Sequence, residues 1–393
     1  MPYMDHAQSH HKKVVLLVRN AAKQDFGGAE TYPVSLAKLL EKEGWSPILV
    51  SRSRKLLDYA SPQSIATRRG WWWAQQNWSG KRALLFPLYV VWQLILSVWY
   101  IQLIIRTHAV AVHTQSRDDL IAATFACSIT RRVVVWTDHM DLRYVFENIT
   151  LPFRNPVGKF VFWTSRFAHH IILISDNERR LVTSHFAHKD ARDKQIVLVK
   201  NGVVDRGQAT PRARSNPVVF CLASRMVANK GVAEAIHAFS GLQQRLSGSE
   251  HKAKLAIYGD GGDLETFKAL AKDIPGITFH GHQDNAIEKV RAADVFVLPS
   301  YQEGFSIALL EATMLGKAII ASDVDSNPEI IIDHETGLLV KPRDIESLQQ
   351  AMYIMATDEP LRHKLERNAR HEYEQQFDLE NIVREQILPL YMH

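Results

Sequence analysis

The sequence predicts an α/β protein of two doubly wound domains, each a parallel β-sheet with helices on both faces. Short apolar runs of strand length recur along the chain, and segments of helical length separate them. A Pro- and Arg-containing stretch without apolar periodicity, residues 203–216, divides the chain near its middle. With 393 residues, of which 46% are hydrophobic, the chain has enough apolar material for two domains of ordinary size.

The individual elements follow from these apolar runs. Strands separated by helices indicate parallel sheets that are covered on both faces. In the N-terminal half we expect strands at residues 14–18, 46–50, 109–113, 132–136 and 170–174. In the C-terminal half we expect strands at 218–223, 255–258, 295–299, 318–321 and 338–340, with helices at 231–246, 264–273 and 307–315. The predicted domains are residues 1–205 and 206–375, and residues 376–393 form a closing helix.

Charge is distributed unevenly between the two halves. Residues 1–205 hold 27 Lys and Arg against 16 Asp and Glu, whereas the remainder holds 20 against 26. A basic N-terminal half points to an anionic partner, which could be nucleic acid, lipid headgroups or a phosphorylated substrate, or else to a solvated basic surface. No nucleic-acid-binding module or aromatic-basic interleaving is present, so we expect no nucleic-acid partner.

The cysteines and the N-terminus bear on the compartment. Cys127 and Cys221 lie far apart in sequence, which supports neither a disulfide framework nor a cysteine-rich metal site. The polar, His-rich first dozen residues do not resemble a secretory signal, and a frayed terminus explains them better than a metal-binding tract. We therefore expect a cytoplasmic protein.

A long apolar stretch departs from the simple two-domain pattern. Residues 83–105 carry no formal charge and meet the length criterion for a membrane-spanning helix. Six of the nine tryptophans lie in or near it, and Trp favours the headgroup zone. Pro87, Gln93, Ser97 and Gln102 interrupt the run, and a strand follows at once. A spanning helix, an internal helix and a helix attached to one membrane face all remain open, and the last is favoured.

The segment EGFSIALLE is the strongest local signal for chemistry. Gly304 allows close approach of the backbone, and the amides that follow would form a helix N-terminus open to an anion. Glu303 would lie at the mouth of this site and Glu311 about two turns down the helix. Carboxylates so placed can accept hydrogen bonds from sugar or ribose hydroxyls, although two surface glutamates would give the same pattern.

Two further segments of the same half support a ligand site. In SRMVANKG, Arg225 and Lys230 follow the first predicted strand and could clamp a diphosphate. In YGDGG, Gly259 ends the next strand, where a ligand could approach the crevice of an α/β sheet.

Together and in this order these segments resemble the retaining glycosyltransferases of family 4, whose two-domain architecture is called GT-B. GGAE at Gly27 to Glu30 looks like the glycine loop of the family, and WTDHMD, with His139, looks like its histidine motif. FHG, AADVFVLPS and NPEII match in type and order in the C-terminal half, so the resemblance covers nearly the whole chain. The acidic residue that usually follows the family's histidine is replaced by Met140, with Asp141 one position later.

The resemblance implies a role for each matching residue. Arg225 and Lys230 would neutralise the donor diphosphate, assisted by the amides near Gly304, Phe305 and Ser306, with Gly259 in the donor site. Glu303 would hold hydroxyls of the donor sugar and Glu311 those of the ribose. Gly27 and Gly28 would let the N-terminal loop approach the phosphate or sugar. His139 would contact the sugar near the reacting carbon, although a strand-capping role is the alternative. His280 and His282 would line the base pocket or be structural.

The resemblance also implies an activity. We expect two Rossmann-like domains that face a cleft, with the C-terminal helix closing back onto the N-terminal domain. The enzyme would move a hexose-type sugar, with retention, from a UDP-sugar, or from GDP-mannose as the alternative. The acceptor would be lipid-linked or a polysaccharide or lipopolysaccharide, at the inner face of the cell membrane. The scheme requires no metal or other cofactor, because fixed positive charge stabilises the leaving diphosphate.

Three other readings stay open. The chain could be a membrane-associated sugar-nucleotide-binding scaffold without turnover, for which the Met140 departure is the motivating feature. It could be a sugar-nucleotide epimerase, which would need additional acid-base carboxylates. It could also be a phosphorylase, which would usually be longer and carry a cofactor lysine.

Overall fold

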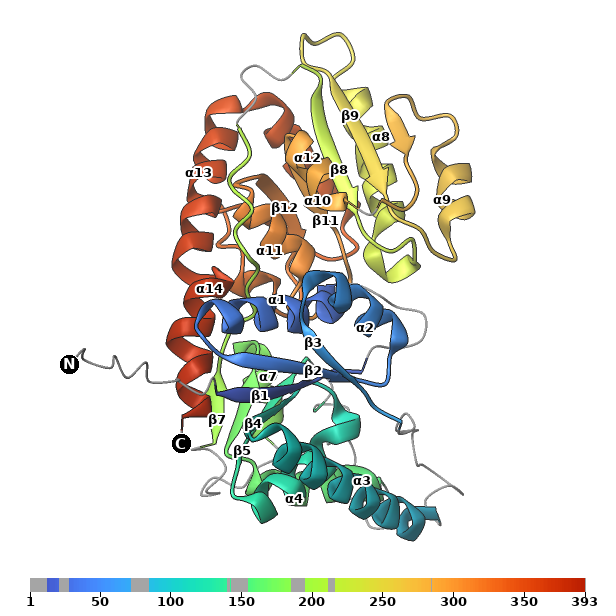
Figure 1. Ribbon diagram of the computed structural model, residues 1–393. Helices are drawn as coiled ribbons and strands as arrows, with labels where there is room; N and C mark the ends of the chain where they lie inside the picture. The colour runs from blue at the N-terminus through green and yellow to red at the C-terminus, as the bar shows by residue number, and fades with distance from the viewer. Residues whose placement is uncertain are drawn as a thin grey trace, which may run out of the picture. The chain divides into compact units, whose positions relative to one another are not determined.

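The computed structural model describes residues 13–20, 28–71, 85–139, 142, 155–184, 195–210, 216–283 and 285–392. The chain divides into two compact units. Unit 1 contains Met1–Ile174, Glu178–Val199 and Val383–His393, and unit 2 contains Ser175–Asn177 and Lys200–Ile382. Each unit is built on one parallel sheet (Figure 1). This confirms the predicted α/β class with two doubly wound domains.

Unit 1 contains a seven-stranded sheet with the order β3-β2-β1-β4-β5-β6-β7. Five of its strands lie where the sequence predicts them, with ends that differ by one or two residues. β3 and β7 lack a predicted counterpart because they are short edge strands without a fully buried face. The strands are β1 (Val14–Val18), β2 (Ser46–Ser51), β3 (Ala66–Arg69), β4 (Ala109–Thr114), β5 (Val133–Asp138), β6 (His170–Leu173) and β7 (Ile196–Leu198).

Helices cover both faces of this sheet because successive strand residues alternate between the two faces. Leu16 and Val18 of β1 belong to the core on the side of α3 and α4, whereas α1 lies on the other side (Figure 1). The helices of unit 1 are α1 (Gly28–Lys42), α2 (Arg54–Ala60), α3 (Phe86–Thr107), α4 (Leu120–Thr130), α6 (Pro156–Thr164) and α7 (Asp176–Thr183).

Unit 2 contains a six-stranded parallel sheet with the order β10-β9-β8-β11-β12-β13. Its strands are β8 (Val218–Ala223), β9 (Ala253–Tyr258), β10 (Ile277–Phe279), β11 (Val295–Leu298), β12 (Ala318–Ser322) and β13 (Leu338–Val340). Its helices are α8 (Val232–Arg245), α9 (Leu264–Ala271), α10 (Ala286–Ala292), α11 (Ile307–Met314), α12 (Ile345–Thr357), α13 (Glu359–Gln376) and α14 (Leu379–Ile382). β8, β11 and β12 are central, so the loops that follow them meet at one edge of the sheet.

The predicted closing helix is wrong in detail. The 18-residue helix α13 ends at Gln376, and the rest consists of the short α14, a π-helical turn at Val383–Ile387 and a 3-10 turn at Leu388–Tyr391. Asp378 and Pro389 interrupt a regular helix here, since Asp favours capping positions and Pro cannot donate its backbone N–H. The segment from Val383 belongs to unit 1, where Tyr391 Oη lies 2.6 Å from His113 Nδ1.

Helix α3 contains most of the apolar stretch at residues 83–105. Among the described residues it is the one helix long and apolar enough to cross a membrane, and 39% of its most apolar window is buried in the protein. Its buried face includes polar residues, Gln93 and Ser97, whereas its exposed face is aliphatic. The helix is therefore apolar on the face where a surface helix is normally polar.

Candidate functional site

The loops that follow β8 and β9 approach one another closely. The Met226 amide donates to Asp260 O at 2.9 Å, and the Ser224 amide donates to Tyr258 O at 3.1 Å. Gly259 has a φ of +135°, and a Cβ there would lie 1.8 Å from Ser224 O. Only glycine fits this position, so YGDGG serves to bring two backbone loops together at the carboxyl ends of the strands.

The loops that follow β8 and β11 meet in a similar way at Gly231. This residue has a φ of +67°, and a Cβ there would lie 1.9 Å from Pro299 O. The Tyr301 amide donates to Asn229 O at 2.9 Å. The segment that carries Lys230 is therefore held against the segment that leads into EGFSIALLE.

This arrangement brings together two residues that the sequence predicts to bind different parts of the donor, the diphosphate and the sugar. Lys230 Nζ lies 2.6 Å from Glu303 Oε1, and the two side chains are 15% and 9% exposed. The Glu303 amide donates to Asp325 Oδ2 at 2.9 Å. Asp325, in the loop after β12 with a φ of +45°, holds the Glu303 backbone and was not predicted from the sequence.

The segment after Glu303 leads into α11. Phe305 is buried, with its ring centroid 6.1 Å from that of Phe377, and Ser306 is the N-cap residue. The Ser306 side chain accepts no capping hydrogen bond, so the first amides of the eight-residue helix are available to an anion. Gly304 is partly buried in the turn before them.

Glu311 and Arg225 complete the predicted donor set. Glu311 lies just over one turn into α11, not two, because the helix begins at Ile307. Burial raises the pKa of the Glu311 carboxyl, and the charge of Arg206 opposes that rise. Arg225 is exposed on the loop after β8.

Two further groups of contacts occur in unit 2. Tyr301 Oη donates to Glu234 Oε1, and the Arg343 guanidinium lies 4.5 Å from the Tyr301 ring centroid. Burial and the neighbouring Glu234 raise the pKa of Tyr301 to about 12, so its hydroxyl stays protonated. His280 stacks on Tyr258 with 4.6 Å between ring centroids, a contact that favours the structural alternative for this histidine.

In unit 1, His139 follows β5 directly. Its ring packs edge-on against Tyr32 with 5.6 Å between centroids. Burial, together with the charge of Arg19, lowers its pKa well below the usual range, so the ring is neutral at physiological pH. The residue is partly exposed, but its Nε2 atom is shielded and has no hydrogen-bond partner among the residues that the structure describes.

The remaining N-terminal predictions can be placed only in part. Gly28 is the first residue of α1, whereas Gly27, Met140 and Asp141 lie outside the described residues. Within the described part of the chain, no group of three or more His, Cys, Asp or Glu side chains is arranged to hold a metal ion.

Family models match both halves of the chain. Residues 206–372 match the model described as "Glycosyl transferases group 1", and residues 26–205 match the model described as "Glycosyltransferase Family 4". The chain belongs to glycosyltransferase family 4. This confirms the family and the enzyme class predicted from the motifs.

Relatives and solved structures agree with this family. The chain is 28% identical over 267 residues to an uncharacterized glycosyltransferase of Methanocaldococcus jannaschii, which covers 63% of this chain and 66% of that protein. It is 32% identical over 242 residues to the N,N'-diacetylbacillosaminyl-diphospho-undecaprenol alpha-1,3-N-acetylgalactosaminyltransferase of Campylobacter jejuni, which covers 58% of this chain and 61% of that protein. The matched part is therefore less than two thirds of the length of these relatives.

The fold also matches solved structures. The Anabaena protein Alr3699/HepE, crystallised in complex with UDP and glucose, aligns with a TM-score of 0.72 at 17% identity, covering 97% of this chain and 99% of that one. At this identity the likeness concerns the fold, and it confirms the GT-B class.

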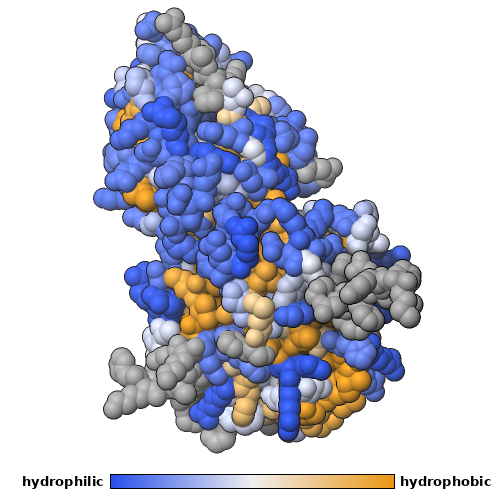
Figure 2. All heavy atoms as spheres, turned by 60° about the vertical axis from the view of Figure 1, so that its left-hand side comes forward, coloured by the Kyte–Doolittle hydropathy of each residue, from blue (hydrophilic) through white to orange (hydrophobic). Residues whose placement is uncertain are grey.

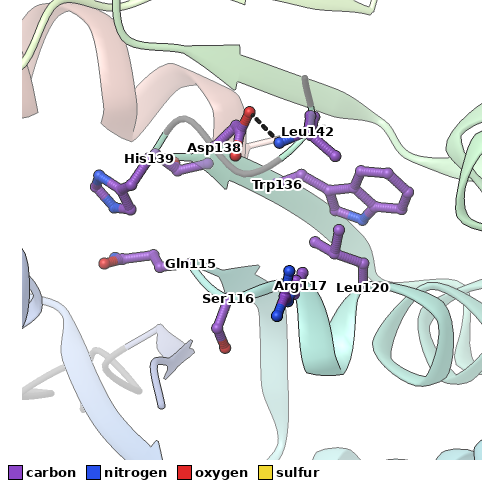
Figure 3. A pocket seen from close by; sticks show the side chains of 9 residues that line it. Gln115, Ser116, Arg117, Leu120, Trp136, Asp138, His139 and Leu142 are labelled. Atoms are coloured by element: carbon purple, nitrogen blue, oxygen red, sulfur yellow. Dashed lines mark hydrogen bonds between the residues drawn. The ribbon is translucent and has the colours of Figure 1, made fainter. Parts of the chain in front are cut away.

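This family 4 glycosyltransferase also contains candidate site residues that its motifs did not reveal. Asp325, Tyr301 and Glu234 contact predicted residues or their neighbours. In unit 1, Gln115 follows β4 and lines the same hollow as His139 (Figure 3). The one signal in the sequence that could have revealed them is their position. Asp325, Tyr301 and Gln115 each follow the carboxyl end of a parallel strand, whereas Glu234 does not.

Proposed function

We propose that this family 4 glycosyltransferase transfers a hexose-type sugar from a nucleoside-diphosphate sugar to a lipid-linked or polysaccharide acceptor. The observation that carries the proposal is the contact between Lys230 and Glu303 beside the N-terminus of α11. A cation and helix amides supply fixed positive charge for a leaving diphosphate. A carboxylate at the same place accepts hydrogen bonds from sugar hydroxyls.

The finer parts of the proposal rest on the same features. UDP is favoured over GDP as the carrier, because a protein of the same fold was crystallised with UDP and glucose. The name of the Campylobacter jejuni relative, which contains diphospho-undecaprenol, supports a lipid-linked acceptor. In this scheme the reaction proceeds with retention, as the family resemblance implies, and it needs no metal because Arg225 and Lys230 neutralise the diphosphate.

The proposed location is the inner face of the cell membrane, with α3 lying on the surface. Residues that extend outward from this helix, among them Leu88 at 64% exposed and Val91 at 53%, form an aliphatic stripe that ends near the exposed Arg106. The opposite face is packed into unit 1, where α4 is its main partner. Hydrophobic areas are visible on this unit in Figure 2. A helix with one packed face supports one-sided attachment over spanning.

Nucleotide-sugar binding and turnover test the central claim. UDP-sugars and GDP-sugars are screened by thermal shift, because a ligand of the folded state raises its stability. Release of the nucleoside diphosphate is then measured with a membrane extract. We expect binding of one donor class, and loss of turnover with retained folding in Lys230→Ala and Glu303→Ala. If no sugar nucleotide binds and none is consumed, the proposal is wrong.

Flotation with anionic liposomes tests the membrane surface. Trp92 and Trp99 are poor probes because both pack against the core, so the variant is Leu88→Ser, Val91→Ser and Ile95→Ser together. Each change removes on the order of 1 kcal/mol of apolar transfer free energy, so vesicle binding should fall roughly 100-fold.

The matched control for flotation replaces two exposed residues of unit 2, Ile332 and Ile345, by Ser and should float like the wild type. If the wild type, the α3 variant and the control all float equally, or if none of them floats, the assignment of the α3 surface is wrong.

A further inference from the structure

Gln115 is a buried glutamine whose side chain makes no hydrogen bond. It follows β4 and is 1% exposed. Its backbone is fixed, since its amide donates to Val18 O at 2.8 Å and its carbonyl accepts from Arg19 Nη1. Both Nε2 and Oε1 of its side chain lack a partner among the described residues.

An unpaired buried amide carries an energetic cost. Leaving a buried donor or acceptor unsatisfied costs about 1–3 kcal/mol, whereas an apolar side chain of similar shape at the same position would cost nothing. The Gln115 amide therefore needs a donor and an acceptor from outside the described residues, which a bound water or a ligand hydroxyl can supply. The cost is recovered when a ligand supplies the missing donor and acceptor.

The surroundings of Gln115 indicate where such a ligand enters. Gln115 and His139 line one small, open hollow at the carboxyl ends of β4 and β5. Figure 3 shows the two side chains extending in the same direction from these neighbouring strands. His139 Nε2 also lacks a partner, so three unsatisfied polar atoms belong to two neighbouring side chains.

The chemistry of these atoms selects the ligand group. A carboxamide offers a donor and an acceptor, and a group that both donates and accepts is needed to satisfy both. A hydroxyl does this. A phosphate or carboxylate oxygen would pair with Nε2 and leave Oε1 unsatisfied.

We propose that Gln115, together with His139, forms a subsite in unit 1 that binds a sugar hydroxyl. This rests on the proposed transferase function and extends it, because Gln115 becomes a specificity-determining residue on the sugar side of the reaction. The hydroxyl belongs either to the acceptor sugar or to the sugar of the donor. The same Gln115 contact serves in both cases.

The test compares Gln115→Leu with Gln93→Leu in the full chain. Gln93 is 2% exposed and has an unpaired Oε1, but it lies in α3 and does not line the hollow. Gln115→Leu removes two unsatisfied polar atoms and should keep or raise the melting temperature. Gln93→Leu also removes a side-chain hydrogen bond to Tyr89, so its melting temperature should fall slightly, and the comparison between the two variants rests on sugar binding. Binding is followed by saturation-transfer difference NMR with methyl glycosides of glucose, galactose, mannose and N-acetylglucosamine. The affinities of UDP and UDP-sugars are measured in parallel.

We expect Gln115→Leu to lose at least 10-fold in affinity for one of two ligands. A weaker affinity for a methyl glycoside would show that the subsite binds the acceptor sugar. A weaker affinity for a UDP-sugar, with the affinity for UDP unchanged, would show that it binds the donor sugar. Gln93→Leu should bind as the wild type does. Sugar binding of Gln115→Leu equal to that of the wild type would overturn the subsite. If the melting temperature of this variant is also lower, Gln115 serves the stability of the fold.

The glycoside measurement requires no turnover and no nucleotide, so it separates the subsite from the proposed function. Glycoside binding that depends on Gln115, in a protein that binds no sugar nucleotide, would support the subsite and contradict the transferase.

Discussion

The contact between Lys230 and Glu303 predicts opposite effects of two substitutions on the affinity for free UDP. In the ligand-free protein Glu303 neutralises Lys230 at 2.6 Å, a gross attraction of about 3 kcal/mol at an effective dielectric constant of about 40. A diphosphate must compete with Glu303 for this cation. Glu303→Gln keeps the shape and the hydrogen bond but removes the competing charge.

The size of the effect follows from Coulomb's law. A phosphate oxygen on the far side of Lys230 would lie roughly 6 Å from the Glu303 carboxylate, given two charge-assisted contacts. At an effective dielectric constant of about 40 the repulsion is about 1.4 kcal/mol, which is about 10-fold in Kd. UDP should therefore bind Glu303→Gln about 10-fold more tightly and Lys230→Met more weakly, while sugar transfer falls in both.

Isothermal titration calorimetry with UDP measures this difference. The control is Glu265→Gln, which removes an acidic partner from the exposed pair with Lys268 and should leave the Kd unchanged. Equal weakening of UDP binding by Glu303→Gln and Lys230→Met would refute the reasoning, because both residues would then act as one positioning pair.

Three further predictions concern folding and pH. Gly231→Ala should weaken UDP binding and lower the melting temperature, because the new Cβ would lie 1.9 Å from Pro299 O. The control is Gly44→Ala, where φ is similar and no atom lies within 4 Å. This control should cost only about 1–2 kcal/mol of backbone strain. Burial lowers the pKa of His113 to about 3. The stability that the neutral His113 ring contributes is therefore complete above pH 6.5 and is lost as the pH falls toward 3, a loss on the order of 5 kcal/mol in the free energy of unfolding. Acid-unfolding curves of His113→Gln should lack this pH dependence. Burial and Asp118 raise the pKa of Asp119 to about 7, so stability decreases as the pH rises from about 4 to 7, and Asp119→Asn should show a smaller decrease, measured by thermal melts at each pH. Identical pH slopes in wild type and variant would contradict the corresponding assignment.

The sequence by itself determined the fold class and indicated most of the residues that we propose for the donor site. Apolar runs of strand length mark buried parallel strands, because such strands are covered on both faces and therefore read as near-continuous hydrophobic runs. EGFSIALLE and SRMVANKG could be recognised because glycines and charged residues stand at fixed places after strands. The edge strands β3 and β7 lacked this signal, since their residues are largely half-exposed or exposed.

Only the tertiary structure decided which of these residues meet. Lys230 and Glu303 are 73 positions apart, and their contact depends on β8 and β11 being neighbours in the sheet. Asp325 joins them because β12 is the next strand. Gln115 has no motif around it, and only the burial of its unpaired amide beside His139 sets it apart. A linear pattern records the type and spacing of residues, whereas strand order and burial arise from packing that distant segments form together.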